Sequence, residues 1–375
     1  MITLPAEVAT DRLVDSVRRL VECESPSADR AAVASSAAVV AAVGGEVLGS
    51  DPEWIVVDGV THLRWCFGSE TSVLVLAHHD TVWPLGTLAR VPFAVRDGIM
   101  TGPGCFDMKA GLAMALHAVA ALEDRRGVTL LVTGDEELGS PRSRALIEDT
   151  ARGARAALVL EASADGGSLK LERKGVSLYE VVVHGRAAHA GLEPERGVNA
   201  TVELAHEVLA VAALADPAIG TSVTPTVAGS GSTTNTVPAR ASFSVDVRAR
   251  TASEQERVDA ALRALEPVHA EAVLEVGGGI NRPPLEAAAS ADLFARAQAI
   301  AAGLGLPPLH GVAVGGGSDG NFTAGIGVPT LDGLGAVGGG AHAEHEHVLV
   351  AELTPRTRLL AALLAELVAD RQEGS

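Results

Sequence analysis

Short apolar runs of strand length alternate with longer helical segments through the first 160 residues of the chain. The run over 72–77 is almost wholly apolar, as expected for a strand that is buried on both faces of a sheet. This alternation is typical of an α/β protein with a mixed, mostly parallel sheet and helices on both faces. The expected strands lie at 54–57, 62–67, 72–77, 128–133 and 156–160, and the expected helices at 6–22, 28–43, 108–122 and 143–149.

The pattern changes near residue 175. Strand-like and helical runs then follow in the order β-α-β-β-α-β, which is the ferredoxin-like α+β pattern, complete in about 100 residues. Glycines at 277–279 and prolines at 283 and 284 mark an exit, after which the α/β pattern resumes. We therefore predict an inserted domain at 175–281, between the first part (1–174) and the second part (282–375) of a larger domain. Its expected strands are 176–183, 221–228, 241–248 and 271–276, and its expected helices are 198–214 and 253–265.

Charge and cysteine content exclude several kinds of partner. The chain has 29 basic and 47 acidic residues, a net charge of −18, which disfavours nucleic acid or an anionic membrane surface as a partner. Three widely spaced cysteines form no disulfide framework, which favours a reducing compartment. The charged N-terminal segment does not resemble a signal peptide, and the apolar run over 31–43 is short for a membrane span. We therefore expect a cytoplasmic protein.

Polar side chains follow the expected strands at the points where those strands end. Ligands of open α/β sheets bind outside the carboxyl ends of the strands, so we expect these side chains to meet at one edge. Two further candidates lie in loops, one before a helix and one late in the chain. The candidates are His78, His79, Asp80, Asp107, Asp135, Glu136, Glu137, Glu161 and His342.

Two histidines, two carboxylates and one bridging carboxylate can hold two divalent metal ions. Nitrogen and oxygen ligands without thiolate favour zinc, with cobalt or manganese as substitutes. Two metals about 3.5–4 Å apart polarise a carbonyl and lower the pKa of water to about 7, and a further carboxylate can act as general base. Each motif is weak alone, because acidic doublets are usually solvated turns. In the tract AHAEHEHV, His345 and His347 are alternatives to His342.

Taken in order, the motifs resemble the dinuclear-zinc amidohydrolase and peptidase family. That family contains carboxypeptidase G (glutamate carboxypeptidase), aminoacylase, acetylornithine deacetylase and succinyl-diaminopimelate desuccinylase. The resemblance covers nearly the whole chain, and Pro103 favours the carboxypeptidase G type. It implies a catalytic α/β domain interrupted by a ferredoxin-like lid that makes a homodimer interface. The motifs are AHHDTVWP, TGPGCFDMKAG, VTGDEELGS, LEASADG, GRAAHAGLEPERGVNA, TTNTVPARASFSVDVR, GGGSDG and AHAEHEHV.

The resemblance also implies a set of metal ligands. His78 and Glu161 would bind one metal, Glu137 and His342 would bind the other, and Asp107 would bridge the two. The family pattern of histidine, any residue, then aspartate selects the first of the two adjacent histidines in AHHDTVWP.

Catalytic and substrate-binding roles follow from the same resemblance. Asp80 would orient the histidine ligand, as metal-bound histidines generally require, and Glu136 would be the general base. His189 of GRAAHAG would reach the active site of the other subunit and stabilise an oxyanion. An arginine in INRPP would clamp a substrate carboxylate, or would instead pair with a nearby acid in a hinge loop. The implied substrate contacts are Asn235, Arg282, Gly317 and Ser318.

These residues predict a zinc-dependent hydrolase that cleaves an amide or peptide bond next to a free carboxylate. The expected substrates are N-acyl amino acids or short peptides, including those that end in glutamate. One alternative is a deacetylase or desuccinylase of a biosynthetic amine. Another is a catalytically silent metal-binding homologue, against which the intact Asp-Glu-Glu motif and His189 both count.

Overall fold

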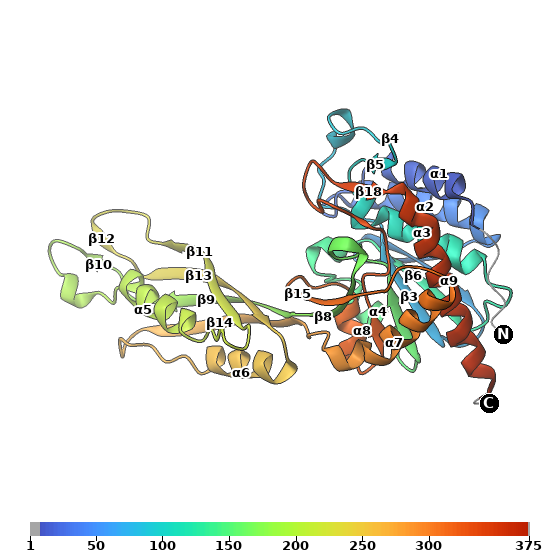
Figure 1. Cartoon of the computed structure of the whole chain (residues 1–375). Coiled ribbons are helices and arrows are strands. Elements are labelled where there is room, and N and C mark those ends of the chain that lie inside the picture. Colours follow the sequence, from blue (N-terminus) through green and yellow to red (C-terminus); the bar gives the residue numbers. More distant parts are fainter. Residues whose placement is uncertain (1–7, 374–375) are drawn as a thin grey trace. The chain divides into compact units, whose positions relative to one another are not determined.

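The computed structural model describes residues 8–373, which divide into two compact units (Figure 1). The large unit contains residues up to 172, together with 287–314 and the chain from 318 onward. The small unit contains residues 173–286 and 315–317.

The large unit contains a six-stranded sheet in the order β1-β2-β6-β3-β7-β16. Strands β6, β3, β7 and β16 are parallel, while β1 and β2 join the edge in antiparallel fashion. The predicted mixed, mostly parallel sheet is therefore confirmed. The strands are β1 (Glu53–Val57), β2 (Val60–Phe67), β3 (Val73–His78), β6 (Val128–Thr133), β7 (Ala156–Val159) and β16 (Thr330–Leu331).

Helices cover both faces of this sheet. Along β3, Val73 and Val75 pack into one hydrophobic cluster, while Leu74 and Leu76 pack into a second. Burial on both sides explains why this strand is continuously apolar in sequence. The first cluster includes residues of α1 (Thr10–Val21), α2 (Arg30–Leu48), α3 (Ala110–Ala120), α7 (Ala287–Gly303) and α9 (Val350–Glu373), and the second includes residues of α4 (Arg144–Ala151) and α8 (Gly320–Gly325).

Helix α2 continues beyond the apolar run expected to end at residue 43. By length and composition alone it could cross a membrane, a test that core helices also pass. Its Val33, Val40 and Val43 are fully buried in the large unit. At Gly44 an added Cβ would lie 2.4 Å from an indole carbon of Trp65, so the missing side chain allows the helix to pack closely on β2. Helix α2 is therefore part of the core.

A small antiparallel sheet that the sequence did not predict joins two distant loops of the large unit. Its order is β17-β18-β5-β4, and β18 pairs with β5 so that His347 lies opposite Thr101. This pairing brings the AHAEHEHV tract beside the TGPGCFD loop. The strands are β4 (Ala94–Arg96), β5 (Ile99–Thr101), β17 (Gly338–Gly339) and β18 (His347–Leu349).

The small unit contains a four-stranded antiparallel sheet in the order β11-β13-β9-β14, with two helices packed on it. Tyr179, Val181 and Phe243 of the sheet share one hydrophobic cluster with Val211 and Val258 of the helices. The predicted ferredoxin-like arrangement is confirmed. Its elements are β9 (Gly175–His184), α5 (Ala200–Ala212), β11 (Ser222–Ser230), β13 (Arg240–Ala249), α6 (Ala252–Arg263) and β14 (Val273–Arg282).

Glycines 277–279, expected to lie beyond the last strand, are inside β14. Gly277 pairs with Glu180, and the ladder to β9 continues through Gly279. The expectation was wrong because backbone hydrogen bonds to a neighbouring strand hold a segment extended even where glycine has a low strand propensity.

Helix α5 buries two glutamates on the face that packs toward the rest of the small unit. The Glu203 carboxylate accepts hydrogen bonds from the backbone N–H groups of Val268 and His269, at 2.6 and 3.0 Å. Glu207, one turn later, is only 2% exposed, and its Oε2 has no hydrogen-bond partner among the described residues. Burial, reinforced by the neighbouring Glu203, raises the pKa of Glu207 to about 7.

We expect Glu207→Gln to stabilise the protein at pH 8 but not at pH 5. The folded state holds the Glu207 proton more tightly than the unfolded chain, whose pKa is 4.5, so stability falls as pH rises from 4.5 through about 7. Glutamine removes this loss, which is about 1–2 kcal/mol after allowance for solvent screening. Thermal unfolding at pH 5 and at pH 8 measures this change in stability. The exposed Glu256→Gln on α6 is the control, and an equal gain from both variants at pH 8 would contradict the prediction.

Candidate active site

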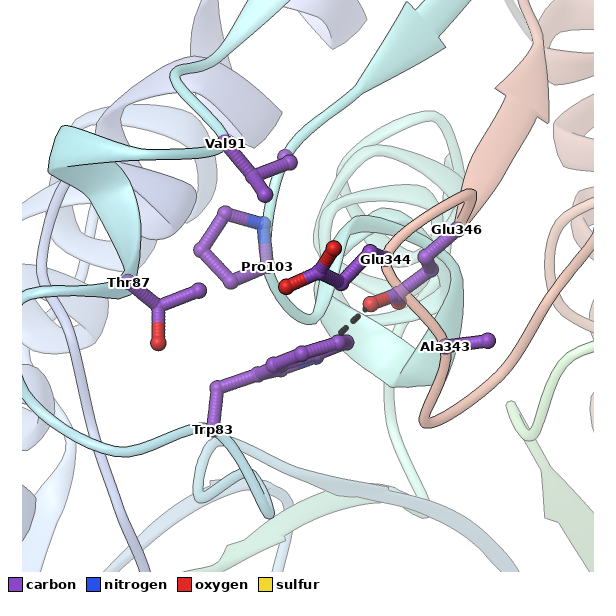
Figure 2. A pocket seen from close by; sticks show the side chains of 8 residues that line it. Trp83, Thr87, Val91, Pro103, Ala343, Glu344 and Glu346 are labelled. Atoms are coloured by element: carbon purple, nitrogen blue, oxygen red, sulfur yellow. Dashed lines mark hydrogen bonds between the residues drawn. The ribbon is translucent and has the colours of Figure 1, made fainter.

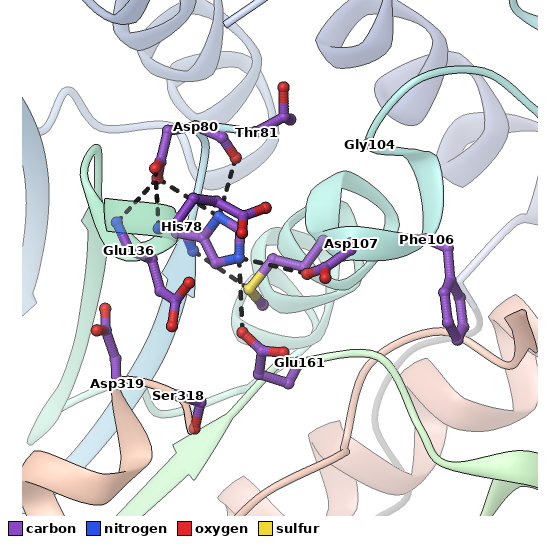
Figure 3. A network of polar contacts seen from close by, with 12 residues as sticks. His78, Asp80, Thr81, Gly104, Phe106, Asp107, Glu136, Glu161, Ser318 and Asp319 are labelled. Carbon is purple, nitrogen blue, oxygen red and sulfur yellow. Dashed lines mark hydrogen bonds and ion pairs between the residues drawn. The ribbon is translucent and has the colours of Figure 1, made fainter. Parts of the chain in front are cut away.

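The carboxyl ends of three parallel strands carry candidate catalytic residues (Figure 3). His78 is the last residue of β3, Glu136 and Glu137 lie in a short 3-10 turn after β6, and Glu161 follows β7. This placement is the one expected for ligands of an open α/β sheet, because parallel strands end at one edge.

Asp107 lies between two histidines that are far apart in sequence. Its Oδ1 is 3.5 Å from Nε2 of His78, and its Oδ2 is 3.3 Å from Nε2 of His342. Nε2 of His78 is also 3.5 Å from Oε1 of Glu161, and Nε2 of His342 is 3.3 Å from Oε2 of Glu137. The structure therefore brings together the five predicted ligands, with one oxygen of Asp107 directed at each histidine.

The buried polar atoms of this cluster fit metal ions. Among the described residues, Nε2 of His78 and Oε1 of Glu137 are buried without a hydrogen-bond partner. Buried polar atoms are normally paired, so these two indicate a missing binding partner. Imidazole and carboxylate donors with no thiolate are ligands that suit zinc, cobalt or manganese.

The electrostatics of the cluster also favour positive charge at this position. Burial would lower the pKa of His78, but the carboxylates of Asp107, Asp80 and Glu161 raise it well above its ordinary value. Asp107 and Glu137 raise the pKa of His342 to about 10. Carboxylates that favour positive charge on both histidines are suited to hold divalent metals in place of those protons.

Asp80 makes contacts beyond the orientation of His78. The His78 Nδ1–H donates to the Asp80 carbonyl oxygen at 3.0 Å, which leaves the Nε2 lone pair directed at the cluster. The fully buried Asp80 carboxylate accepts the backbone N–H groups of both Glu136 and Glu137, at 3.2 Å each, and the Ser27 hydroxyl at 2.6 Å. Asp80 therefore also holds the turn that presents both glutamates, a contact that no sequence spacing indicates.

Glu136 is buried beside the first group of ligands. Its carboxylate, the His78 ring and the Glu161 carboxylate each offer an atom within 4.8 Å of the others. Figure 3 shows the Glu136 side chain pointing into the same space as these two residues. The Glu136 carboxylate lies beside these predicted ligands, whereas Asp107 is the carboxylate between the two histidines. Such a position suits Glu136 to proton transfer.

The neighbouring histidines make their described hydrogen bonds outside the carboxylate cluster. The His347 Nδ1–H donates to the His345 carbonyl oxygen, which lies outside the carboxylate cluster. His79 is buried, and its Nε2–H donates to the Thr61 carbonyl oxygen at 3.1 Å. Burial lowers the pKa of His79 to about 4, which keeps it neutral in the core. His78 and His342 remain as the histidines of the cluster.

A two-stranded ladder between distant segments of the small unit brings His189 and Asn235 together. β10 (Ala188–His189) pairs with β12 (Thr236–Val237), and the Asn235 carbonyl oxygen accepts the Ala190 N–H at 2.9 Å. His189 is exposed, and its Nδ1 accepts the Gly191 N–H at 3.1 Å. The neutral ring therefore carries its proton on Nε2, which leaves that atom as a donor.

The other predicted substrate contacts lie in two places. Arg282, 8% exposed, ends β14 in the small unit, where its carbonyl oxygen accepts Nε2–H of Gln255. Gly317 also belongs to the small unit, and its carbonyl oxygen accepts Nη1–H of Arg173 at 3.3 Å. Ser318 is buried in the large unit, where its hydroxyl donates to Asp332 and its N–H to Asn321. Both donors of Ser318 are therefore engaged, one by Asn321 of α8 and one by Asp332 after β16.

Asp319 is a structural residue that sequence reasoning missed. Its carboxylate accepts the hydroxyls of Thr133, at 2.9 Å, and of Ser140. These two residues bracket the turn that bears Glu136 and Glu137. The motif GGGSDG indicated only a glycine-rich loop, because a hydrogen bond to a residue so far away in sequence leaves no local pattern.

Comparisons with known proteins find similar sequences and a similar fold. A model of peptidase family M20/M25/M40 matches residues 74–366. Carboxypeptidase G2 of Pseudomonas sp. (strain RS-16) is 37% identical over 201 residues, which cover 52% of this chain and only 48% of that protein. A succinyl-diaminopimelate desuccinylase of Methylorubrum populi is 31% identical over 327 residues, 79% of this chain and 83% of that protein. The crystal structure of the M20 family metallo-carboxypeptidase Sso-CP2 from Sulfolobus solfataricus shares the fold, with a TM-score of 0.73 at 16% identity over 95% of this chain and 99% of that one.

Proposed function

Because the chain belongs to peptidase family M20/M25/M40, we propose that it is a metal-dependent hydrolase that cleaves an amide or peptide bond next to a free carboxylate. The observation that carries this proposal is the position of Asp107 between His78 and His342, with the Glu136 carboxylate near His78 and Glu161. In this proposal the large unit is catalytic and the small unit is a lid.

Five side chains would hold two metal ions. His78 and Glu161 would bind one, His342 and Glu137 the other, and Asp107 would be shared, with zinc favoured and cobalt or manganese as substitutes. When bound, such a metal pair polarises the scissile carbonyl and lowers the pKa of water.

Glu136 would transfer a proton from the attacking water to the leaving amine. As the water oxygen bonds to the carbonyl carbon, a Glu136 carboxylate oxygen accepts the water proton, and it passes this proton to the amine nitrogen as the C–N bond breaks. The hydrogen bond from the Glu136 N–H to Asp80 supports this role, because it fixes the turn that presents the side chain.

The lid residues would bind the substrate. We propose that the Nε2–H of His189 stabilises the oxyanion that forms at the carbonyl oxygen, and that Asn235, beside the paired strand β12, contacts the substrate. The guanidinium of Arg282 would bind the substrate carboxylate, and Gly317 would contact the substrate through its backbone. Because Asn321 and Asp332 engage both donors of Ser318, we propose that Ser318 anchors its loop to the large unit.

A substrate panel tests the reaction and separates it from its alternatives. The desuccinylase alternative is supported by the Methylorubrum populi relative, which matches most of this chain. Metal-reconstituted enzyme is offered N-acetyl and N-succinyl amino acids, N-succinyl diamines and peptides that end in glutamate, and the released amines are quantified. We expect release from substrates with a carboxylate next to the amide. Turnover confined to succinylated diamines would favour the alternative, and no turnover with both metals bound would favour a silent homologue.

The small unit also supports a homodimer. β11 is an edge strand of its sheet, and exposed apolar residues line the adjacent helix α5 at helical spacing, Val202 and Leu209 being 54% and 71% exposed. Val227 on β11 is 74% exposed. An unpaired strand edge beside an apolar stripe is suited to pair with a second copy. We propose that two chains associate through this face.

We expect Leu209→Glu to convert the dimer to a monomer, because a charge buried in an apolar interface loses its hydration. Light scattering coupled to gel filtration measures the mass. Val273→Glu places the same charge on β14 at the other edge of the sheet, where Val273 is 60% exposed, and should leave the dimer intact. A monomeric wild type, or dissociation by Val273→Glu alone, would contradict the proposed face.

We propose that the protein acts in the cytoplasm on a small carboxylate-bearing substrate, with neither nucleic acid nor membrane as a partner. All three cysteines are free thiols, which suits a reducing compartment. The net charge of −18 disfavours anionic polymers and surfaces.

A further inference from the structure

One buried carboxylate outside the ligand set accepts four hydrogen bonds. Oε1 of Glu346 accepts the backbone N–H groups of Phe106 and Asp107, at 2.8 and 3.0 Å. Its Oε2 accepts the Gly104 N–H at 2.9 Å and the indole Nε1–H of Trp83 at 2.8 Å. Figure 2 shows the Trp83–Glu346 bond at the wall of a small cavity. Glu346 is only 2% exposed, so these donors take the place of water.

The four donors surround an ionised carboxylate. The backbone N–H groups of the Gly104–Asp107 turn converge on one point, an arrangement that binds anions. Each oxygen of Glu346 accepts two N–H groups, which matches the lone pairs of a carboxylate. Burial raises the pKa of Glu346, and these hydrogen bonds oppose that rise.

Glu346 joins the two chain segments that form one half of the proposed metal centre. The turn it binds ends at Asp107, whose own N–H is one of the four donors. The loop it belongs to carries His342, four residues earlier, and Asp107 and His342 approach to 3.3 Å. Through Trp83 the same carboxylate also reaches the loop that follows Asp80. A displacement of Glu346 therefore changes the separation of Asp107 and His342.

We propose that Glu346 is a positioning residue that sets the separation of Asp107 and His342 and thereby the affinity of the centre for metal. The inference rests on the proposed function only in taking these two residues as ligands. Partners behind the ligands of metal sites typically change metal affinity by about 10–100-fold.

The test is Co²⁺ binding by metal-free protein, followed by calorimetry and by the visible absorption of the cobalt enzyme. In Glu346→Gln, an amide NH₂ replaces one oxygen and faces two N–H donors. We expect Co²⁺ affinity to fall by about 10–100-fold, with a changed absorption spectrum. Trp83→Phe removes one of those opposing donors, so the double variant Trp83→Phe/Glu346→Gln should bind Co²⁺ more tightly than Glu346→Gln alone. Purely structural damage would not produce this rescue.

Glu344→Gln is the matched control, since Glu344 lies in the same loop but is exposed and pairs with Arg90. It should bind Co²⁺ as the wild type does. Wild-type affinity and spectrum in Glu346→Gln would overturn the inference while leaving the metal centre itself intact. A wild type that binds no Co²⁺ would instead contradict the proposed function. If Glu346→Gln does not fold, Trp83→Phe alone decides: a weaker affinity supports the inference, and an unchanged one overturns it.

Discussion

We expect Glu136→Gln to lower kcat by a factor of about 10² to 10⁴ while both proposed metal sites stay filled. Glutamine keeps the size and the backbone contacts of Glu136, including the hydrogen bond from its N–H to Asp80, but it cannot accept a proton. A loss of 10³ corresponds to about 4 kcal/mol of activation free energy. Because Glu136 is not among the five proposed ligands, metal content should remain at two ions per chain.

Steady-state kinetics and elemental analysis on the same preparation measure the two quantities. Glu123→Gln removes an exposed carboxylate from the same unit and should change neither. Near-wild-type turnover in Glu136→Gln would refute the proton-transfer role. Loss of metal together with activity would instead make Glu136 a ligand.

We expect removal of metal to abolish turnover, and activity to return as Zn²⁺ or Co²⁺ is added back, with a plateau at two equivalents per chain. Without metal ions, the site formed by Asp107, Glu137 and Glu161 contains no cation that could polarise a substrate carbonyl or activate water. The apoprotein should also unfold at a lower temperature, because each ion that binds only the folded state stabilises it by about 2.7 kcal/mol at 100 times its Kd.

The His342→Ala variant is a control for the number of metal ions bound per chain. His342→Ala removes a ligand of one proposed ion and leaves His78 and Glu161 for the other, so back-titration should reach its plateau near one equivalent. Metal-free enzyme with undiminished turnover would contradict the proposal. A wild-type plateau at one equivalent would contradict the pairing of ligands around Asp107.

Part of the active site could be predicted from local sequence. His78, Glu136 and Glu161 follow apolar runs that form β3, β6 and β7, and parallel strands end at one edge, so their meeting required no more than the strand pattern. Asp107 and His342 were assigned by resemblance to a family, because both lie in loops whose positions depend on the pairing of β5 with β18.

Other contacts could not be predicted from the local sequence. Asp319 reaches Thr133 and Ser140, and Glu346 reaches the Gly104–Asp107 turn, across long separations in sequence. An aspartate or glutamate in a glycine-rich or histidine-rich tract is equally compatible with a solvated surface, so only burial and donor geometry identify these two as structural residues.

The amino-acid sequence by itself determined the layers of both units and the sheet edge at which the chemistry lies, because alternation of apolar residues records which face of each strand and helix is buried. The choice of His78 over His79, and of His342 in its tract, followed from resemblance to the family. Tertiary structure alone decided which further carboxylates brace the site: Asp80 holds the turn of Glu136 and Glu137, and Glu346 holds the Gly104–Asp107 turn. The physical reason is separation along the chain. Burial patterns appear in consecutive residues, whereas hydrogen bonds between loops form only after segments that are distant in sequence have packed together.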